Sequence, residues 1–432
     1  MRLILWHGYL LEGTGSNIYT QHIARAWGRL GHDVCLICQQ RRAQQFDLGP
    51  RVRVVRPDVG PLLPVFVLDR YEGVEARHVA DFGSAELDRY TAANAAAIAA
   101  ELDRYTAANA AAITAELERT PADLVLANHA LMGGPVAAAA CGSETPYAVK
   151  VHGSELEYAI RGRPQLAAMA RDALAGAAAV FAGSQHIVSV TEELLGEGAY
   201  RRALRIVPPG VDTDGFAPGR GSLPALLRLL EAGAGRGSPD HPAERTADAG
   251  AAAQLAGAGR FVLYFGKLMR QKGVHLLLDA WRDVAPRHPG TGLVIVGFGD
   301  ARAQLEAQAP PGVIFTGAMD HEQLQLLVPL AEAVVVPSVL PEAFGMVAAE
   351  AAACEVVPIV SDHSGLAEVA AGLGEAGITF DGTAADLAVR LDALLGLPDG
   401  ERARLGAIAR AAVVARWSWE GIARRLLADS LA

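Results

Sequence analysis

Short apolar runs alternate with helical stretches along the first half of the chain. The region between the first two runs carries Ile23, Trp27 and Leu30 at helical spacing, which predicts a helix from about Ser16 that ends at Gly31. The apolar runs themselves predict strands at 2–7, 33–38, 52–56, 123–127, 147–151, 179–183 and 205–207. Alternation of this kind predicts a parallel sheet covered by helices on both faces.

The second half of the chain repeats the pattern. Six further strands are predicted at 261–266, 292–299, 312–317, 333–338, 356–362 and 377–380. Between the halves lies "VPPGVDTDGFAPG", whose prolines and glycines interrupt regular structure. The sequence therefore predicts an α/β protein with two doubly wound domains.

Two segments have the character of insertions. Residues 219–258 are rich in Gly, Ala, Pro and Arg and are predicted to be a mobile linker with one short helix, "LPALLRLLEA". Residues 86–115 are a tandem copy, "ELDRYTAANAAAIAA" followed by "ELDRYTAANAAAITA". A 15-residue copy lengthens a helix by about 22 Å and hardly rotates its apolar face. We interpret it as a duplication with no role in function.

Composition excludes several classes of protein. The chain has 432 residues, of which 51% are hydrophobic and 20% charged, so each domain can bury a core. The chain has 48 acidic and 38 basic residues, and this net negative charge argues against nucleic-acid binding. No apolar run approaches the length of a membrane span, and the N-terminus lacks the pattern of a signal peptide, so a cytoplasmic protein is expected. Small basic patches leave peripheral contact with a membrane open.

The cysteines and the short acidic motif do not predict a metal site. Cys35 and Cys38 form a C-x-x-C motif, but strand alternation sends their side chains to opposite faces, and no second pair has zinc spacing. Asp212 and Asp214 resemble a metal-binding D-x-D motif, yet they follow "VPPG", where aspartates favour a turn. We expect no metal and no cofactor.

Two glutamates stand in an almost wholly apolar segment, "PEAFGMVAAEAAA". A helix that is apolar on nearly every side is buried, and a buried carboxylate needs a partner. Phe344, Gly345 and Met346 fall at the helix start, where free N–H groups and the helix dipole favour an anion. Glu342 and Glu350, on either side of that point, are placed to accept hydrogen bonds from hydroxyls. A nucleoside diphosphate sugar fits this arrangement, because it has hydroxyls at both ends and phosphates between them.

Two lysines supply the matching positive charge. Lys267 follows Gly266 at the end of the predicted strand 261–266, and Lys272 precedes Gly273 at the start of the next helix. Both are expected at the carboxyl edge of the second sheet, where open α/β folds bind ligands. Two ammonium groups can stabilise a departing diphosphate in place of a divalent metal ion.

In this order along the chain, these motifs resemble the retaining glycosyltransferases of the GT-B fold, in particular glycosyltransferase family 4 (glycosyl transferases group 1). The resemblance also covers "GTGSNIYTQHIARAWGRLGHDV", "KVHGSELEY", "AVFAGSQHI" and "SDHSGLAEV", and so nearly the whole chain. It implies two Rossmann-like domains that face each other across a cleft. We expect an acceptor-side domain at 1–207, a donor-binding domain at 208–405 and a C-terminal helix at 406–432 that crosses back to the first domain.

The resemblance also implies roles for individual residues. Glu342 corresponds to the glutamate that contacts the donor sugar, Glu350 to the one that binds the ribose hydroxyls, and His152 to a histidine that faces the donor sugar. Lys267 and Lys272 correspond to the basic pair on the diphosphate. The remaining donor-binding positions are glycines and backbone groups: Gly13, Gly15, Gly266, Phe344, Gly345 and Met346.

Two positions depart from the family pattern. Lys267 stands where arginine is commoner, and a lysine cannot grip a phosphate with two parallel hydrogen bonds. Ala343 stands where proline is common.

The predicted function is that of a metal-independent retaining glycosyltransferase of the hexosyltransferase type. The donor is expected to be a UDP-sugar or GDP-sugar, and the acceptor is a hydroxyl on a sugar, a lipid-linked molecule or a small natural product. Two alternatives stay open: an enzyme similar to UDP-GlcNAc 2-epimerase, and a non-catalytic sugar-nucleotide binding protein. The base, the sugar and the acceptor are not determined by the sequence.

Overall fold

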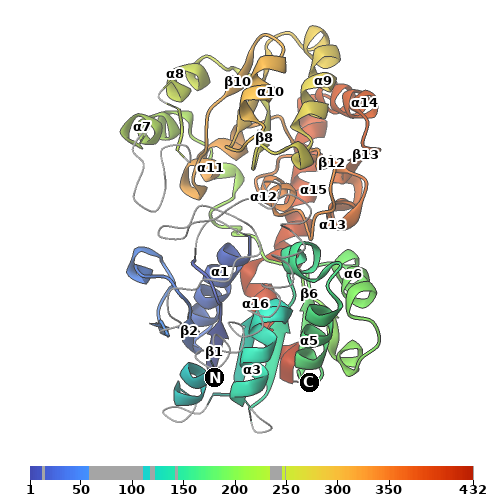
Figure 1. The fold of residues 1–432 in the computed structure, drawn as a ribbon. Coiled ribbons are helices and arrows are strands. Elements are labelled where there is room, and N and C mark those ends of the chain that lie inside the picture. Colours follow the sequence, from blue (N-terminus) through green and yellow to red (C-terminus); the bar gives the residue numbers. More distant parts are fainter. Residues whose placement is uncertain are drawn as a thin grey trace. The chain divides into compact units, whose positions relative to one another are not determined.

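A computed structural model describes residues 1–11, 15–57, 110–116, 122–141, 145–233, 246–248 and 250–431 of the chain. The chain divides into two compact units, drawn in Figure 1. The first unit combines Met1–Gly210 with Trp419–Ala432, and the second is Val211–Ser418. Gly13 and residues 86–109 of the tandem copy lie outside the described residues.

The first unit contains a seven-stranded parallel sheet in the order β3-β2-β1-β4-β5-β6-β7. Its strands are β1 (Arg2–Trp6), β2 (Asp33–Ile37), β3 (Val52–Val55), β4 (Leu124–Asn128), β5 (Tyr147–Lys150), β6 (Ala179–Ala182) and β7 (Leu204–Ile206). All seven predicted strands are confirmed. Every residue of β4, β5 and β6 is buried, as expected for parallel strands covered on both faces.

The second unit contains a six-stranded parallel sheet in the order β10-β9-β8-β11-β12-β13. Its strands are β8 (Arg260–Phe265), β9 (Thr291–Val296), β10 (Val313–Phe315), β11 (Ala333–Val336), β12 (Pro358–Ser361) and β13 (Ile378–Phe380). The six predicted strands are confirmed here too, and the prediction of two doubly wound α/β domains is correct.

The winding of each sheet reverses at one point. In the first sheet the helix α1 (Gly15–Arg29) connects β1 to its neighbour β2 on one side. On the other side, α3 (Gly134–Cys141) connects β4 to β5 and α5 (Pro164–Leu174) connects β5 to β6, so the strands are added in the opposite direction across the sheet. Because such crossovers are right-handed, α1 lies on one face and α3 and α5 on the other. The reversal falls between β1 and β4, and in the second sheet between β8 and β11. Open α/β sheets bind ligands at the carboxyl edge of this reversal.

The segment predicted as a mobile linker is folded wherever the structure describes it, and that prediction is corrected. The predicted short helix is present as α7 (Leu223–Gly233), and a second helix, α8 (Ala251–Ala256), was not predicted. Leu226 and Leu230 of α7 and Leu255 of α8 are buried in the core of the second unit. Both helices have a short apolar stripe, and this explains why they are folded onto the core. α7 and α8 pack against each other, and α7 also packs on α11 (His321–Leu327).

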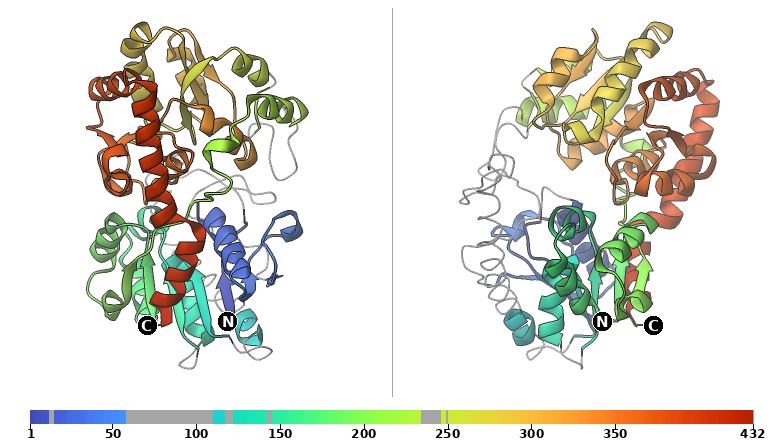
Figure 2. Two further views of the ribbon diagram at one scale, coloured as in Figure 1. Left: turned by 180° about the vertical axis from the view of Figure 1, so that it is seen from behind. Right: turned by 45° about the vertical axis from the view of Figure 1, so that its right-hand side comes forward.

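The C-terminal helix is shorter than predicted. Residues 406–417 belong to α15 (Asp399–Trp417), which is part of the second unit, and only α16 (Trp419–Leu431) belongs to the first. The helical conformation is interrupted at Ser418, whose backbone is extended; both helices are drawn in Figure 2. Trp419 stacks on the His22 ring of α1, with 5.0 Å between ring centroids and 3° between planes. Trp419 therefore anchors the last helix on α1, whereas Trp417 contacts Phe344 inside the second unit.

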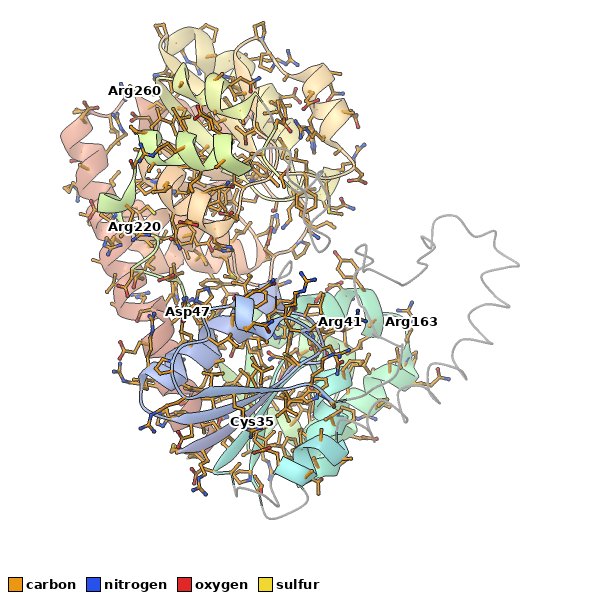
Figure 3. All side chains as sticks on the ribbon, turned by 90° about the vertical axis from the view of Figure 1, so that its left-hand side faces the viewer. Cys35, Arg41, Asp47, Arg163, Arg220 and Arg260 are labelled. Atoms are coloured by element: carbon orange, nitrogen blue, oxygen red, sulfur yellow. The ribbon has the colours of Figure 1, made fainter. Side chains whose placement is uncertain are left out.

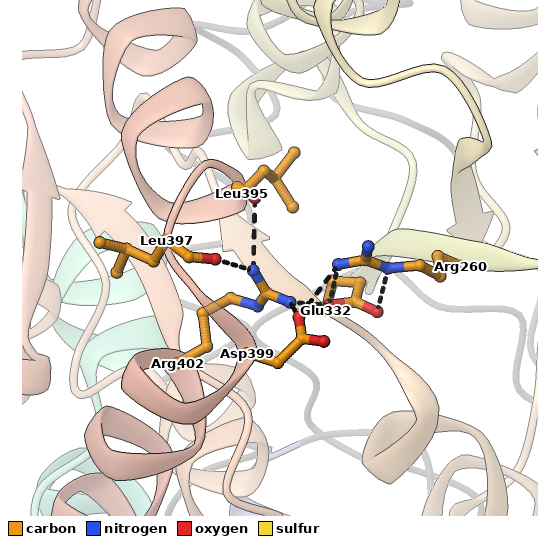
Figure 4. A network of polar contacts seen from close by, with 6 residues as sticks. All are labelled: Arg260, Glu332, Leu395, Leu397, Asp399 and Arg402. Carbon is orange, nitrogen blue, oxygen red and sulfur yellow. Dashed lines mark hydrogen bonds and ion pairs between the residues drawn. The ribbon is translucent and has the colours of Figure 1, made fainter.

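Charged residues close the amino edge of the second sheet, away from the ligand-binding edge. Arg260, at the start of β8, donates two hydrogen bonds to the Glu332 carboxylate, at 2.8 and 3.0 Å. Arg402 of α15 contacts the same carboxylate at 3.2 Å and donates to the carbonyl oxygens of Leu395 and Leu397 (Figure 4). This network ties α15 to the sheet, and we assign it a structural role.

The cysteines are all free and buried. Cys35 lies within β2, which is next to the edge strand β3 of the first sheet (Figure 3). Burial raises the pKa of the Cys38 thiol to about 11, which makes this thiol a poor nucleophile.

Replacing Trp27 with alanine tests how α16 is held. Trp27 is fully buried in α1, and its indole N–H donates to the Ala423 carbonyl of α16 at 3.0 Å. The variant should lose about 3–5 kcal/mol of unfolding free energy, because it creates a cavity and leaves a buried carbonyl without its donor. Denaturant titration measures the loss. The control Val389→Ala, at an exposed position, should change stability by less than about 0.5 kcal/mol.

Candidate functional site

The candidate site lies at the carboxyl edge of the second sheet, at the reversal between β8 and β11. Gly266 and Lys267 follow β8, and Pro337 and Ser338 follow β11. The Gly266 N–H donates to the Val296 carbonyl at 3.0 Å, and the Tyr264 hydroxyl donates to the Lys267 carbonyl at 2.8 Å. These bonds fix the main chain at both predicted positions.

A close backbone approach sets the position of Lys272. The turn Arg270–Lys272 ends at Gly273, which has φ of +69°. A Cβ atom at Gly273 would lie 1.8 Å from the Pro337 carbonyl oxygen, so glycine is required both by conformation and by space. The Val339 N–H donates to the Gln271 carbonyl at 2.8 Å. The loop after β8 is therefore held against the loop after β11.

This approach brings Lys272 and Glu342 into direct contact. The Lys272 ammonium lies 2.5 Å from Oε1 of Glu342, and the Ser338 hydroxyl donates to the same oxygen at 2.5 Å. Burial alone would raise the pKa of Glu342, but the charge and hydrogen bond of Lys272, together with Ser338, lower it overall. The carboxylate thus stays ionised and keeps its capacity to accept hydrogen bonds.

The segment after β12 positions Glu342 from the other side. The Glu342 N–H donates to the Ser364 hydroxyl oxygen at 2.9 Å, and the Gly365 N–H donates to the Glu342 carbonyl at 3.0 Å. His363 lies 2.9 Å from the Ser338 carbonyl through Nε2, which must therefore carry the proton, and Nδ1 faces the Ser364 hydroxyl at 3.1 Å. His363 was not predicted from the sequence, although it belongs to the segment "SDHSGLAEV".

The helix α12 (Met346–Ala353) begins at this point. Its N-cap, Gly345, has φ of +114°, and a Cβ atom there would lie 2.6 Å from Cδ2 of Leu366. Among the described residues, no hydrogen bond is formed by the backbone N–H groups of Phe344, Gly345 or Met346. These three N–H groups and the positive end of the helix dipole can bind an anion.

Glu350 has a partner that the sequence did not indicate. Its side chain is 8% exposed and lies 3.6 Å from Nε2 of His321, at the start of α11. Burial lowers the pKa of His321, but Glu350 raises it by hydrogen bonding and charge, and Asp320 and Asp212 add to this effect; the net shift is upward. The Glu350 carboxylate thus faces an imidazole whose protonated form it favours, a pairing that only the tertiary structure reveals.

The predicted site residues of the first unit lie at the corresponding edge of their own sheet. His152 follows β5 and is the N-cap of α4 (Gly153–Glu155). Gly15 begins α1, and a Cβ atom there would meet no described heavy atom within 4 Å, so packing does not require glycine at this position. How these residues lie relative to the second unit stays a prediction.

Among the described residues, no three or more His, Cys, Asp or Glu side chains lie together in a way that could hold a metal ion. Asp212 instead accepts a hydrogen bond from the Gly215 N–H at 3.0 Å, which is the turn predicted for that motif. None of the helices in the described ranges is long and apolar enough to cross a membrane.

Two family models match the chain, and they do not overlap. Residues 14–210 match the glycosyl transferase 4-like domain, and residues 251–412 match the glycosyl transferases group 1 domain. Between them they leave only the two ends and residues 211–250 unmatched. The chain therefore belongs to the glycosyl transferases group 1, a family of transferase enzymes with the GT-B fold.

Curated relatives match parts of the chain. A glycogen synthase of Mycobacterium tuberculosis is 34% identical over 168 residues, which are 38% of this chain and 40% of that protein. A D-inositol 3-phosphate glycosyltransferase of Corynebacterium jeikeium is 31% identical over 55% of this chain and 54% of its own length. A GDP-mannose-dependent mannosyltransferase of Mycolicibacterium smegmatis is 30% identical over 52% and 55%. The chain thus spans about half the length of the curated relatives it matches, or less.

Solved structures share the fold across nearly the whole chain. A sucrose-phosphate synthase from Thermosynechococcus elongatus has a TM-score of 0.65 and 22% identity, covering 99% of this chain and 97% of that one. The Anabaena protein HepE, in complex with UDP and glucose, has a TM-score of 0.64 and 17% identity, with coverage of 99% and 98%.

Replacing His321 with glutamine should make stability depend less on pH. The raised pKa of His321 means that its pairing with Glu350 stabilises the fold below the usual histidine pKa, and that this contribution is lost as pH rises through the raised value. The variant should be less stable than wild type at about pH 5.5, by at most about 1 kcal/mol, and equal to it at about pH 8.5. Denaturant titrations at both pH values measure this, with His275→Gln as control. An equal loss at both values contradicts the ion pair.

Proposed function

We propose that the chain is a metal-independent retaining glycosyltransferase that uses a UDP-sugar or a GDP-sugar. The acceptor is a hydroxyl on a sugar, a lipid-linked molecule or a small natural product. The observation that carries this proposal is the contact between Lys272 and Glu342 beside the start of α12. It places a cation, an ionised carboxylate and free backbone donors at the ligand-binding edge of one sheet.

In this proposal the donor diphosphate lies against the start of α12. The backbone N–H groups of Gly345 and Met346 donate to phosphate oxygens, and Lys272 and Lys267 supply the positive charge that a divalent ion supplies in other transferases. These groups act where negative charge grows as the sugar departs. They therefore lower the barrier to bond breaking and do not merely tighten binding.

Glu342 and Glu350 bind hydroxyl groups on either side of the diphosphate. Glu342 is ionised and hydrogen-bonded on one oxygen by Lys272 and Ser338, so its second oxygen is available to a sugar hydroxyl. Glu350 lies four residues, just over one turn, after the first residue of α12 and would accept from the ribose hydroxyls. When the nucleotide binds, either the contact between His321 and Glu350 breaks, or the Glu350 carboxylate interacts with His321 and the ribose at the same time.

The relatives support a nucleotide-sugar donor. One of them is named as GDP-mannose-dependent, and the structure of HepE contains UDP and glucose. Retention of configuration fits a front-face route, in which the leaving phosphate accepts the proton of the acceptor hydroxyl. In that route no protein carboxylate acts as nucleophile.

Two substitutions test the donor site. Lys272→Met removes the cation and Glu350→Gln removes the acceptor charge, and each should weaken binding of UDP or GDP about 10–100-fold, because a hydrogen bond to a charged group contributes about 1.5–3 kcal/mol. Isothermal titration calorimetry measures the change. Arg390→Met, at an exposed ion pair with Asp386, is the matched control and should bind normally. Normal binding by both site variants would falsify the assignment.

The stereochemical outcome tests the reaction class. Proton NMR of the product of a UDP-sugar or GDP-sugar and an acceptor should show the anomeric configuration of the donor, and adding EDTA should leave the rate unchanged. Inversion contradicts the retaining mechanism, and loss of activity with EDTA contradicts metal independence. Conversion of UDP-GlcNAc without any acceptor would indicate an epimerase instead.

A further inference from the structure

The reversal point of the first sheet collects buried polar side chains that the proposed reaction does not yet use. His7 follows β1, Asn128 ends β4 and His129 comes next, so all three lie at the carboxyl edge beside His152. His7 and Asn128 are fully buried, and His129 is nearly so. Buried polar groups are normally hydrogen-bonded, and the hydrogen bonds of Asn128 fix the orientation of its amide.

The amide of Asn128 can face only one way. Its Nδ2 lies 3.4 Å from the Trp6 carbonyl oxygen and 3.2 Å from the Thr20 hydroxyl oxygen. A carbonyl oxygen can only accept, and the Thr20 hydroxyl already donates to the Ser16 carbonyl at 2.8 Å, so it accepts as well. A flipped amide would place oxygen against two acceptors. The geometry therefore directs Oδ1 of Asn128 away from them.

That oxygen determines the protonation of His152. Nε2 of His152 lies 2.9 Å from Oδ1 of Asn128, which has no proton to donate. Nε2 must therefore carry the proton, and in the neutral ring Nδ1 has the lone pair. The main chain is fixed as well, because the His152 N–H donates to the Glu155 carboxylate at 3.0 Å.

The surroundings of His152 in the first unit oppose a second proton. Its ring centroid lies 4.6 Å from that of His129 and 5.7 Å from that of Tyr19. Burial, followed by the charges of His129, Lys150 and His7, holds the pKa of His152 well below its usual value. The buried Glu155 carboxylate accepts hydrogen bonds from the backbone N–H groups of Ala130, Leu131 and His152. It is therefore bonded to the backbone and not to the imidazole ring of His152.

We propose that Asn128 is a positioning residue that holds His152 as the neutral Nε2–H tautomer. The proposal rests on the proposed function, in which His152 faces the donor sugar. A neutral ring with its lone pair on Nδ1 can accept a hydrogen bond from a sugar hydroxyl. It also adds no positive charge beside a sugar that becomes cationic as the diphosphate leaves.

The tautomer can be observed without any substrate. In protein labelled with ¹⁵N-histidine, long-range ¹H–¹⁵N correlation spectra should show His152 with a protonated Nε2 and an unprotonated Nδ1, unchanged between about pH 6 and about pH 8. The His152→Gln variant assigns the signals. An Nδ1–H tautomer or an imidazolium in this range overturns the proposal, whether or not the protein transfers sugar.

Substitutions of Asn128 connect the tautomer to turnover. Asn128→Asp still accepts from Nε2 but adds a negative charge that favours the imidazolium, so kcat should fall about tenfold on the acid side of the profile and recover as pH rises. Asn128→Ala removes the acceptor and should lower kcat about tenfold or more at every pH, with UDP or GDP affinity unchanged. Thr191→Val, which removes a buried polar group elsewhere in the first unit, is the control and should keep the wild-type profile.

The outcomes separate this proposal from the proposed function. A wild-type pH profile for Asn128→Asp, in a protein that does transfer sugar, overturns the role of Asn128 alone. Absence of any transfer with the Nε2–H tautomer in place contradicts the proposed function and leaves the tautomer established. If either variant of Asn128 fails to fold, the wild-type spectra still decide whether His152 is the Nε2–H tautomer.

Discussion

The candidate site depends on the ion pair between Lys272 and Glu342. Each residue comes from a loop after a different strand, and neither loop would hold its charged side chain in place alone. The pair forms because Gly273 lets the first loop touch the Pro337 carbonyl and because Ser338 and Ser364 bind Glu342 from two sides. Such a partly buried pair adds little net stability, since desolvation offsets the attraction. Its value is that it keeps a carboxylate ionised and an ammonium fixed beside the start of α12.

The two units carry different polar groups at the reversal points of their sheets. Both sheets reverse their winding next to the first strand, and both collect polar groups at that point. The second unit collects cations, carboxylates and free backbone N–H groups, a set that suits an anion with hydroxyls. The first unit collects neutral imidazoles and amides, and burial lowers the pKa of His7 to about 4. Burial disfavours charge on these imidazoles, and uncharged imidazoles and amides suit hydrogen bonding to sugar hydroxyls.

Much of this could be predicted from sequence because it is local. The strand runs, the glycine that ends the first helix and the spacing of Glu342 from Glu350 can all be recognised from residues close together in the sequence. The partners of the site were not predicted, because His321 meets Glu350 and His363 meets Ser338 only after the strands have paired. The insertion was misjudged for a related reason: its composition resembles a linker, but the buried faces of Leu226, Leu230 and Leu255 depend on helices elsewhere in the unit. The end of the chain was misjudged because its helical pattern continues through the break at Ser418.

A crystal structure of the protein with UDP or GDP tests the central claim most directly. We expect phosphate oxygens within about 3.2 Å of the Lys272 ammonium and of the backbone N–H groups of Gly345 and Met346, with the ribose hydroxyls on Glu350. A nucleotide that binds elsewhere, while Lys272 and Glu342 remain paired with each other and the start of α12 stays without an anion, would contradict the proposed site.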